Sequence, residues 1–203
     1  LTQPLPMRPF RGLIRRLMVG YNNRFDLVMA PSQILAKQIK DEGINSPVQY
    51  ITNPIVFQQN ANVEPAERTP GFTILFAGRL GKEKNIGYLI RSFADLLKKK
   101  PDSILWIAGC GPEETTLKTL CEAFKISKKV KFLGFLDHPT LAKYYAACDI
   151  FVLPSLLETQ GLVAMEAMWF GKPIIVTNKI VSATELVEKG VNGYIVDASL
   201  VED

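Results

Sequence analysis

Short, almost uninterrupted apolar runs recur along the chain from Phe72 onward, and a turn and an amphipathic stretch follow each one. The runs cover residues 72–77, 104–108, 130–135, 150–153 and 173–177. They are rich in Ile, Val, Leu and Phe, which is typical of strands buried on both faces of a parallel sheet. Between the runs, apolar residues repeat at helical spacing, as Leu117, Leu120, Cys121 and Phe124 do.

Strands that alternate with helices predict right-handed crossovers and an α/β fold with a doubly wound parallel sheet. Asp137 is expected to cap the helix after the third strand, and a further helix is expected between Ser182 and Gly190. In such folds ligands bind beyond the carboxyl ends of the strands. We therefore expect function in the loops at 78–85, 109–113, 134–137, 154–161 and 177–184.

The first part of the chain has a different pattern. We expect a basic helix over 9–25, strands at 27–30 and 48–51, and a helix over 32–42 that Ser32 caps. Residues 1–56 are too few for a stable α/β domain, so we interpret them as the end of a larger N-terminal domain.

Residues 57–70 are polar, contain two prolines and show no periodicity, which predicts a linker. We interpret residues 71–203 as a second, Rossmann-like α/β domain. Because the chain starts at Leu1, we expect it to be a piece of a longer protein. Because it ends soon after a strand-like segment at 194–196, we expect its C-terminal domain to lack the last helices.

Composition excludes several classes of protein. The net charge is only +4, from 24 Lys and Arg against 20 Asp and Glu, so no nucleic-acid partner is expected. Three cysteines with neither disulfide nor zinc spacing predict a reducing, cytoplasmic location. The single histidine, His138, excludes a histidine-rich metal centre, and no apolar run is long enough to span a bilayer.

The stretch 154–168 carries the strongest chemical pattern. A strand ends at Pro154 and a helix is expected to begin near Gly161, so free N–H groups at its first turn could hold a phosphate. Those groups belong to Gly161, Leu162 and Val163. Glu158 in the loop and Glu166 in the helix would accept hydroxyl hydrogen bonds on either side, which suits a sugar–diphosphate–ribose ligand. The alternative is a charged loop followed by a surface glutamate.

Arg79 and Lys84 follow the first of these strands. An arginine can hold a phosphate through two parallel hydrogen bonds and a lysine adds a point charge, so both could offset charge on a departing diphosphate. The alternative is a pair of solvated cations in a turn, which is how we interpret Lys82 and Glu83.

The other strand ends exclude some cofactors. Gly109-Cys110-Gly111-Pro112 lacks the third glycine of a dinucleotide fingerprint, because Glu114 stands there, and no nucleoside-triphosphate P-loop occurs. We assign Gly109 to donor binding, and the main chain at Leu136 could pair with a base edge. For His138 a turn or cap role is favoured over catalysis.

Taken together, these motifs resemble the group 1 family of retaining glycosyltransferases with the GT-B fold. In order, they read Gly-Arg-Leu-x3-Lys-Asn, Gly-x-Gly-Pro, Phe-x-Gly and Ser-x2-Glu-x2-Gly-x4-Glu-Ala-Met-x2-Gly-Lys-Pro. The run 158–162 is similar to members that glycosylate diacylglycerol-type lipids, which is a weaker resemblance. Val56 departs from the family, because many members have Asp at that position.

The resemblance implies a nucleotide-diphosphate sugar donor, with UDP-sugar expected, and no metal or other cofactor. Arg79 and Lys84 would contact the diphosphate and Glu158 the sugar hydroxyls. Glu166 would hold the ribose, and the Leu136 main chain the base. The enzyme would transfer a hexose to a lipid or saccharide acceptor with retention, although the isolated fragment would transfer little.

Two alternatives stay open for function: a sugar-nucleotide-binding module without catalysis, and a GT-B-like epimerase. Two interpretations also stay open for the basic segment 6–16, which contains Arg11, Arg15 and Arg16. It could lie as an amphipathic helix on the inner face of an anionic membrane, or cover the rest of its own domain.

Overall fold

The computed structural model describes residues 10–55, 57, 63–68 and 70–198, and it contains two compact units, Leu1–Asn53 and Pro54–Asp203. The described part of the first unit contains α1 (Arg11–Asn22), β1 (Val28–Ala30), α2 (Gln33–Asp41) and β2 (Val48–Tyr50). The two strands pair in parallel, and the Ser32 hydroxyl accepts the Leu35 N–H at 3.0 Å, as the capping prediction requires. Residues 6–9 of the basic segment lie outside the described residues.

In its described part, the second unit is built on a six-stranded parallel sheet with the order β5-β4-β3-β6-β7-β8. The strands are β3 (Thr73–Ala77), β4 (Ile104–Ala108), β5 (Val130–Gly134), β6 (Ile150–Leu153), β7 (Ile174–Thr177) and β8 (Gly193–Val196). The doubly wound parallel sheet predicted from the sequence is therefore confirmed, with strand bounds within one residue of those expected. Every residue of β3 and β4 is buried, which explains their continuous apolar pattern.

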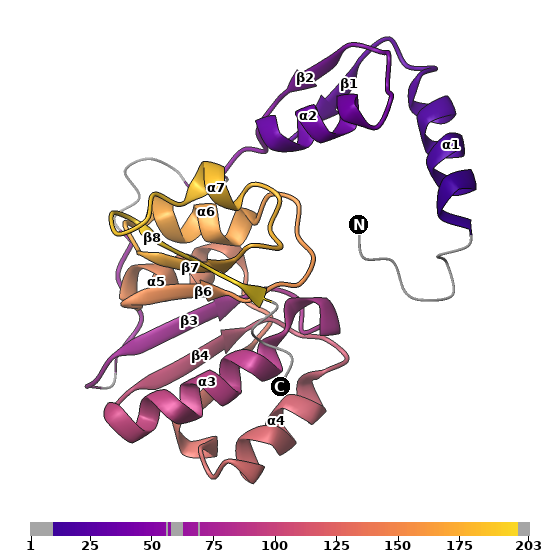
Figure 1. Ribbon diagram of the computed structural model, residues 1–203. Helices are drawn as coiled ribbons and strands as arrows, with labels where there is room; N and C mark the ends of the chain where they lie inside the picture. Colours follow the sequence, from indigo (N-terminus) through magenta and orange to yellow (C-terminus); the bar gives the residue numbers. More distant parts are fainter. Residues whose placement is uncertain (1–9, 56, 58–62, 69, 199–203) are drawn as a thin grey trace. The chain divides into compact units, whose positions relative to one another are not determined.

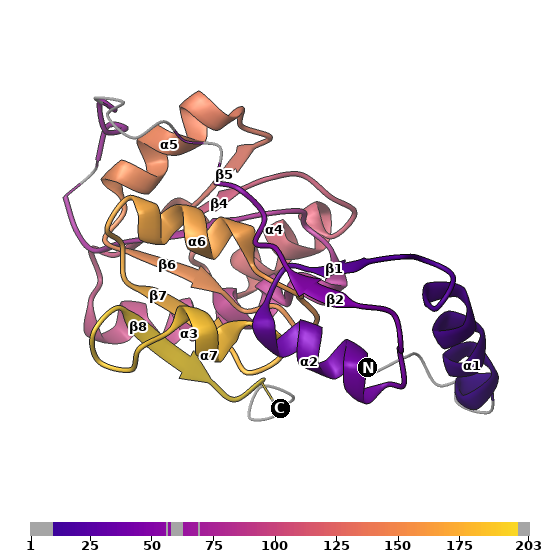
Figure 2. The same cartoon turned by 90° about the horizontal axis from the view of Figure 1, so that it is seen from above.

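Helices cover both faces of this sheet. They are α3 (Ile86–Lys99), α4 (Glu114–Ala123), α5 (His138–Ala147), α6 (Leu162–Trp169) and α7 (Ala183–Leu186), with short 3-10 turns η2 (Lys82–Lys84) and η3 (Ser127–Lys129). In Figures 1 and 2, α3 and α4 lie together on one side of the strands, and α5 and α6 lie on the other. The Asp137 carboxylate caps α5 by accepting the Thr140 N–H at 3.0 Å, as predicted.

The expected helix up to Gly190 is wrong in its length, because α7 ends at Leu186. The Ser182 hydroxyl bonds to the Gln160 carbonyl, 2.8 Å away, instead of capping the helix. Asn192 ends the helix, since its side chain donates to the Leu186 carbonyl at 2.9 Å and accepts the Glu188 N–H at 2.9 Å. A side chain that bonds to free main-chain groups in this way competes with further helical turns.

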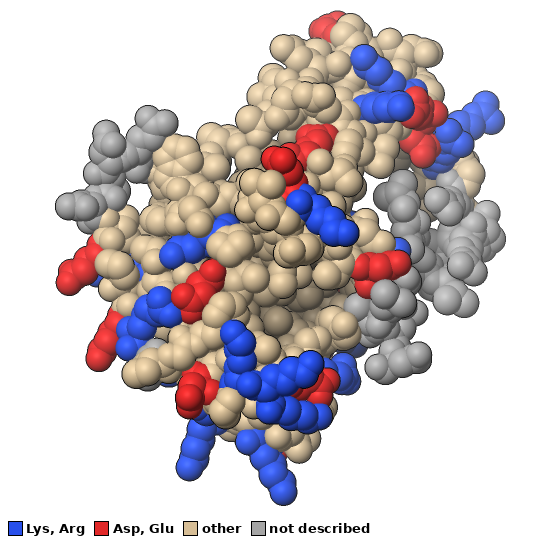
Figure 3. Space-filling view, turned by 60° about the vertical axis from the view of Figure 1, so that its left-hand side comes forward, with Lys and Arg blue, Asp and Glu red and all other residues tan. Residues whose placement is uncertain are grey.

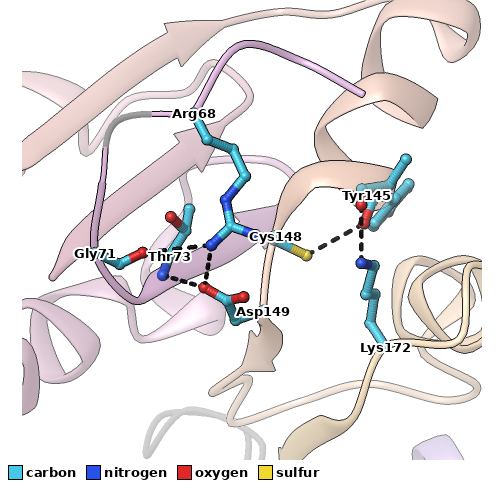
Figure 4. A network of polar contacts seen from close by, with 8 residues as sticks. Arg68, Gly71, Thr73, Tyr145, Cys148, Asp149 and Lys172 are labelled. Atoms are coloured by element: carbon cyan, nitrogen blue, oxygen red, sulfur yellow. Dashed lines mark hydrogen bonds and ion pairs between the residues drawn. The ribbon is translucent and has the colours of Figure 1, made fainter. Parts of the chain in front are cut away.

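The segment predicted as a linker packs on the second unit in its described part. Phe57 contacts the rings of Tyr145 and Phe170, with centroids 6.0 and 5.1 Å away. Arg68 pairs with the Asp149 carboxylate, which also accepts the Thr73 N–H, each at 2.7 Å (Figure 4). The segment is thus attached where β3 and β6 begin. Val56 lies outside the described residues.

Several cations of the second unit lie on or beside α3 and β5. The last turn of α3 contains Lys98 and Lys99, and η3 contains Lys128 and Lys129. Figure 3 shows Lys and Arg concentrated at the end of the second unit where α3 and α4 lie. Within the residues that the structure describes, no helix combines the length and apolar character needed to cross a bilayer.

Candidate functional site

The site lies where the chain direction through the sheet reverses. From β3 the chain continues through β4 and β5 toward one edge, and from β6 it continues through β7 and β8 toward the other. β3 and β6 are neighbours, with Leu75 opposite Phe151. In open α/β sheets a crevice forms at the carboxyl ends of two such strands, and ligands bind there. The loops after β3 and β6 contain Arg79, Lys84, Glu158 and Gly161.

These two loops are joined directly. The Leu156 N–H donates to the Glu83 carbonyl at 2.8 Å, and Lys84 Nζ lies 2.5 Å from Glu158 Oε2. The Lys84 and Glu158 side chains are only 16% and 21% exposed, so this ion pair is shielded from water on most sides. The structure therefore brings together the cation expected at the diphosphate and the carboxylate expected at the sugar.

A pocket of about 370 Å³ opens at the same edge of the sheet. Five of the residues predicted for the site line it: Arg79, Gly109, Leu136, Val163 and Glu166. They come from the loops after β3, β4 and β5 and from α6. Among the described residues, the pocket lining does not include Lys84, Glu158, Gly161 or Leu162, which occupy the adjoining loops.

Gly109 allows two strand-end loops to approach closely. Its φ is +132°, and a Cβ placed there would lie 1.9 Å from the Gly78 carbonyl oxygen. Its N–H donates to the Gly134 carbonyl at 2.7 Å. The visible role of Gly109 is therefore to form the wall of the pocket, because any side chain would push the loops apart.

The start of α6 presents main-chain donors, as the sequence predicts. Gly161 precedes the helix with φ +71° and ψ +51°, and the first intrahelical bond runs from the Ala164 N–H to the Gly161 carbonyl at 2.8 Å. The N–H groups of Leu162 and Val163 thus belong to the open first turn. The loop after β7 supports this turn, because the Val181 N–H donates to the Glu158 carbonyl at 3.0 Å.

Glu166 is a buried carboxylate in the pocket wall. It is 8% exposed, and its Oε2 accepts a hydrogen bond from the Tyr145 hydroxyl at 2.8 Å. Burial raises the pKa of Glu166, and the Tyr145 hydrogen bond and the nearby His138 lower it by less. The alternative interpretation of Glu166 as a surface glutamate is wrong, because α6 turns this position inward.

Sequence reasoning missed three features of the pocket. Phe135 is 81% exposed and lines the pocket. Its position between Gly134 and Leu136, in a strand-end loop, is the sequence feature that could have identified it. His138 caps no helix but lines the pocket, while Asp137 supplies the cap. Tyr145 lies in the core, and no sequence signal pairs its hydroxyl with Glu166. Among the described residues, no group of three or more His, Cys, Asp or Glu side chains could hold a metal ion.

This fold defines a class, the glycosyltransferases with the GT-B fold. The Anabaena protein HepE, solved in complex with UDP-glucose, superimposes with a TM-score of 0.75 and 26% identity, over 96% of this chain and 58% of that one.

The family model for glycosyl transferases group 1 matches residues 57–203, and the chain belongs to that family. An uncharacterized glycosyltransferase of Methanocaldococcus jannaschii is 38% identical over 139 residues, which are 68% of this chain and 34% of that protein. The alpha-monoglucosyldiacylglycerol synthase of Acholeplasma laidlawii is 37% identical over 126 residues, 62% of this chain and 31% of that protein. The chain thus spans about a third of the length of these two relatives.

Proposed function

We propose that this chain is the donor-binding part of a retaining glycosyltransferase that transfers a hexose from a UDP-sugar to a lipid or saccharide acceptor. The observation that carries the proposal is that Arg79, Gly109, Leu136, Val163 and Glu166 line the same pocket, at the carboxyl ends of the strands where the sheet reverses direction. HepE, with UDP-glucose bound, supports the choice of donor. The lipid synthase among the relatives supports a lipid acceptor.

The proposed roles follow from charge and position. Arg79 and Lys84 bind the diphosphate and stabilise the negative charge that grows on it as the sugar leaves. No metal ion is required in this scheme, because the two cations supply the positive charge. The main-chain N–H groups of Gly161, Leu162 and Val163 add donors at the positive end of α6.

The two carboxylates bind opposite ends of the donor. Glu158, held beside Lys84, accepts hydrogen bonds from sugar hydroxyls close to the diphosphate. Glu166 accepts hydrogen bonds from the ribose, and the Leu136 main chain meets the base. Because Lys84 and Glu158 form an ion pair, the group at the diphosphate and the group at the sugar are close together. Both side chains would therefore contact the donor near the bond that breaks.

Titration calorimetry on the 203-residue chain tests this division. Glu166→Ala should weaken UDP and UDP-glucose alike, and Glu158→Ala should spare UDP and weaken only UDP-glucose. Glu113→Ala, in the loop after β4 and outside this pocket, is the matched control and should change neither. Equal losses for both ligands in both site variants would contradict the assignment, as would binding of GDP or ADP in preference to UDP.

Transfer itself is tested on the full-length enzyme with a donor panel and lipid, saccharide and small-alcohol acceptors. The proposal expects a glycosylated acceptor with the donor's anomeric configuration. An isomerised sugar nucleotide with no glycosylated product would instead indicate an epimerase, and binding without turnover would indicate a non-catalytic module.

A further inference from the structure

Tyr145 is linked to the pocket through a single hydrogen bond. Its side chain is 0% exposed and is not among the residues that line the pocket. Its hydroxyl donates to Glu166 Oε2 at 2.8 Å, a buried hydrogen bond between α5 and α6. A hydroxyl that donates to a carboxylate fixes the orientation of that carboxylate and uses one of its lone pairs.

The Tyr145 ring is held firmly in place by other aromatic rings. Phe170 stacks on it with centroids 5.7 Å apart, and Phe151 lies at the same distance at a tilt. Phe57 contacts it edge-on at 6.0 Å. Because these contacts fix the ring, they also fix the direction in which its hydroxyl points.

We propose that Tyr145 is a positioning residue, which orients the Glu166 carboxylate for the ribose hydroxyls while itself touching no part of the donor. The inference rests on the proposed function, since it takes Glu166 as the ribose-binding group. Packing of the ring alone would stabilise the fold, whereas the hydroxyl acts on Glu166. The two roles can be separated because phenylalanine keeps the ring and removes only the hydroxyl.

The experiment compares UDP with 2′,3′-dideoxy-UDP by titration calorimetry on the 203-residue chain. Tyr145→Phe should weaken UDP about five- to tenfold, since a hydrogen bond to a charged group is lost, and should change the dideoxy ligand by less than about twofold. Tyr144→Phe is the matched control, because Tyr144 lies on the same helix as Tyr145. Its ring packs edge-on against Trp106, with the centroids 5.0 Å apart. It should leave both affinities unchanged.

The pH dependence of UDP affinity gives a second readout. The titratable and charged side chains that line the pocket with Glu166 are Arg79, Cys110 and His138, and the Tyr145 hydroxyl bonds to Glu166 from behind the pocket. Removing the Tyr145 hydroxyl takes away a hydrogen bond that lowers the pKa of Glu166, so the loss of UDP affinity on acidification should begin at a higher pH in Tyr145→Phe. Titration of the UDP phosphates is common to all variants and cancels in the comparison.

Glu166→Ala distinguishes failure of this inference from failure of the proposed function. If Glu166→Ala leaves UDP affinity unchanged, both the ribose assignment and the role of Tyr145 are overturned. If Glu166→Ala weakens UDP but Tyr145→Phe behaves as Tyr144→Phe does, only the positioning role is overturned. Equal weakening of UDP and dideoxy-UDP in Tyr145→Phe would indicate a packing role and would also overturn it.

Discussion

Lys84 has two partners in this account, the Glu158 carboxylate in the structure and the donor diphosphate in the proposed reaction. Its ion pair with Glu158 holds the ammonium group at the strand ends before any donor arrives. When a cation is already in place, little free energy is spent on moving it as negative charge develops on the leaving group. Lys84 should therefore contribute more to the transition state than to donor binding.

Lys84→Ala should lower kcat of the full-length enzyme about 100-fold, while KM for the donor changes by a few-fold. Lys82→Ala, an exposed lysine in the same turn, is the control and should stay within about twofold of the unmodified enzyme. Steady-state kinetics with varied donor separate the two constants. A rise in KM at constant kcat would contradict the proposed role of Lys84.

Glu166 makes stability depend on pH. Burial raises its pKa in the folded state, so its contribution to stability is fully present below the ordinary carboxyl pKa and is lost as pH rises through the raised value. Glu166→Gln removes this dependence. The free energy of unfolding of Glu166→Gln, relative to the unmodified chain, should therefore increase as pH rises across that window.

Urea unfolding of the ligand-free chain at a series of pH values measures this difference. Glu122→Gln, at an exposed position of α4, serves as the control and should show a smaller change over the same range. A Glu166→Gln difference that stays constant with pH would show that the folded-state pKa is not raised.

At the scale of elements, the first turn of α6 depends on a left-handed glycine. Gly161 has φ +71°, and a Cβ there would lie 3.3 Å from Leu153 Cδ2. Gly171, just after α6, has φ +68° and open space around a Cβ. The two glycines therefore share the same backbone cost and differ in what surrounds them.

Gly161→Ala and Gly171→Ala should each lower the free energy of unfolding by about 1–2 kcal/mol, because alanine is disfavoured in the left-handed region. Only Gly161→Ala should also weaken UDP, since the first turn of α6 must shift away from Leu153. Urea unfolding and calorimetry measure the two effects. Equal UDP affinity in both variants would show that the Gly161 turn does not contact the diphosphate.

The elements of the second unit could be predicted closely because their strands are buried on both faces. The continuous apolar runs of β3 and β4 are typical of such strands, and the side chain that caps α5 is a local signal. The end of α7 could not be predicted, because Asn192 acts on it from a loop six residues away.

The residues of the site were predictable only in part. Local motifs and strand-end positions marked Arg79, Lys84, Glu158 and Glu166. The Lys84–Glu158 and Tyr145–Glu166 pairs join residues 74 and 21 positions apart, and only the tertiary fold brings them together. Phe57 was assigned to a linker because its neighbours in the sequence are polar. Its contact with the core of the second unit therefore leaves no apolar pattern in the sequence.

At the scale of the whole molecule, the chain spans about a third of the length of its relatives in M. jannaschii and A. laidlawii. Every proposed donor contact lies in the second unit. The proposed transfer to an acceptor is properly tested on the full-length protein.

A crystal structure of this chain soaked with UDP-glucose would locate the donor. The proposed site predicts diphosphate density between the loop after β3 and the first turn of α6, with Arg79 and Lys84 in contact with it and Glu166 at the ribose. Density elsewhere on the second unit, or a diphosphate bound without Arg79 and Lys84, would contradict it.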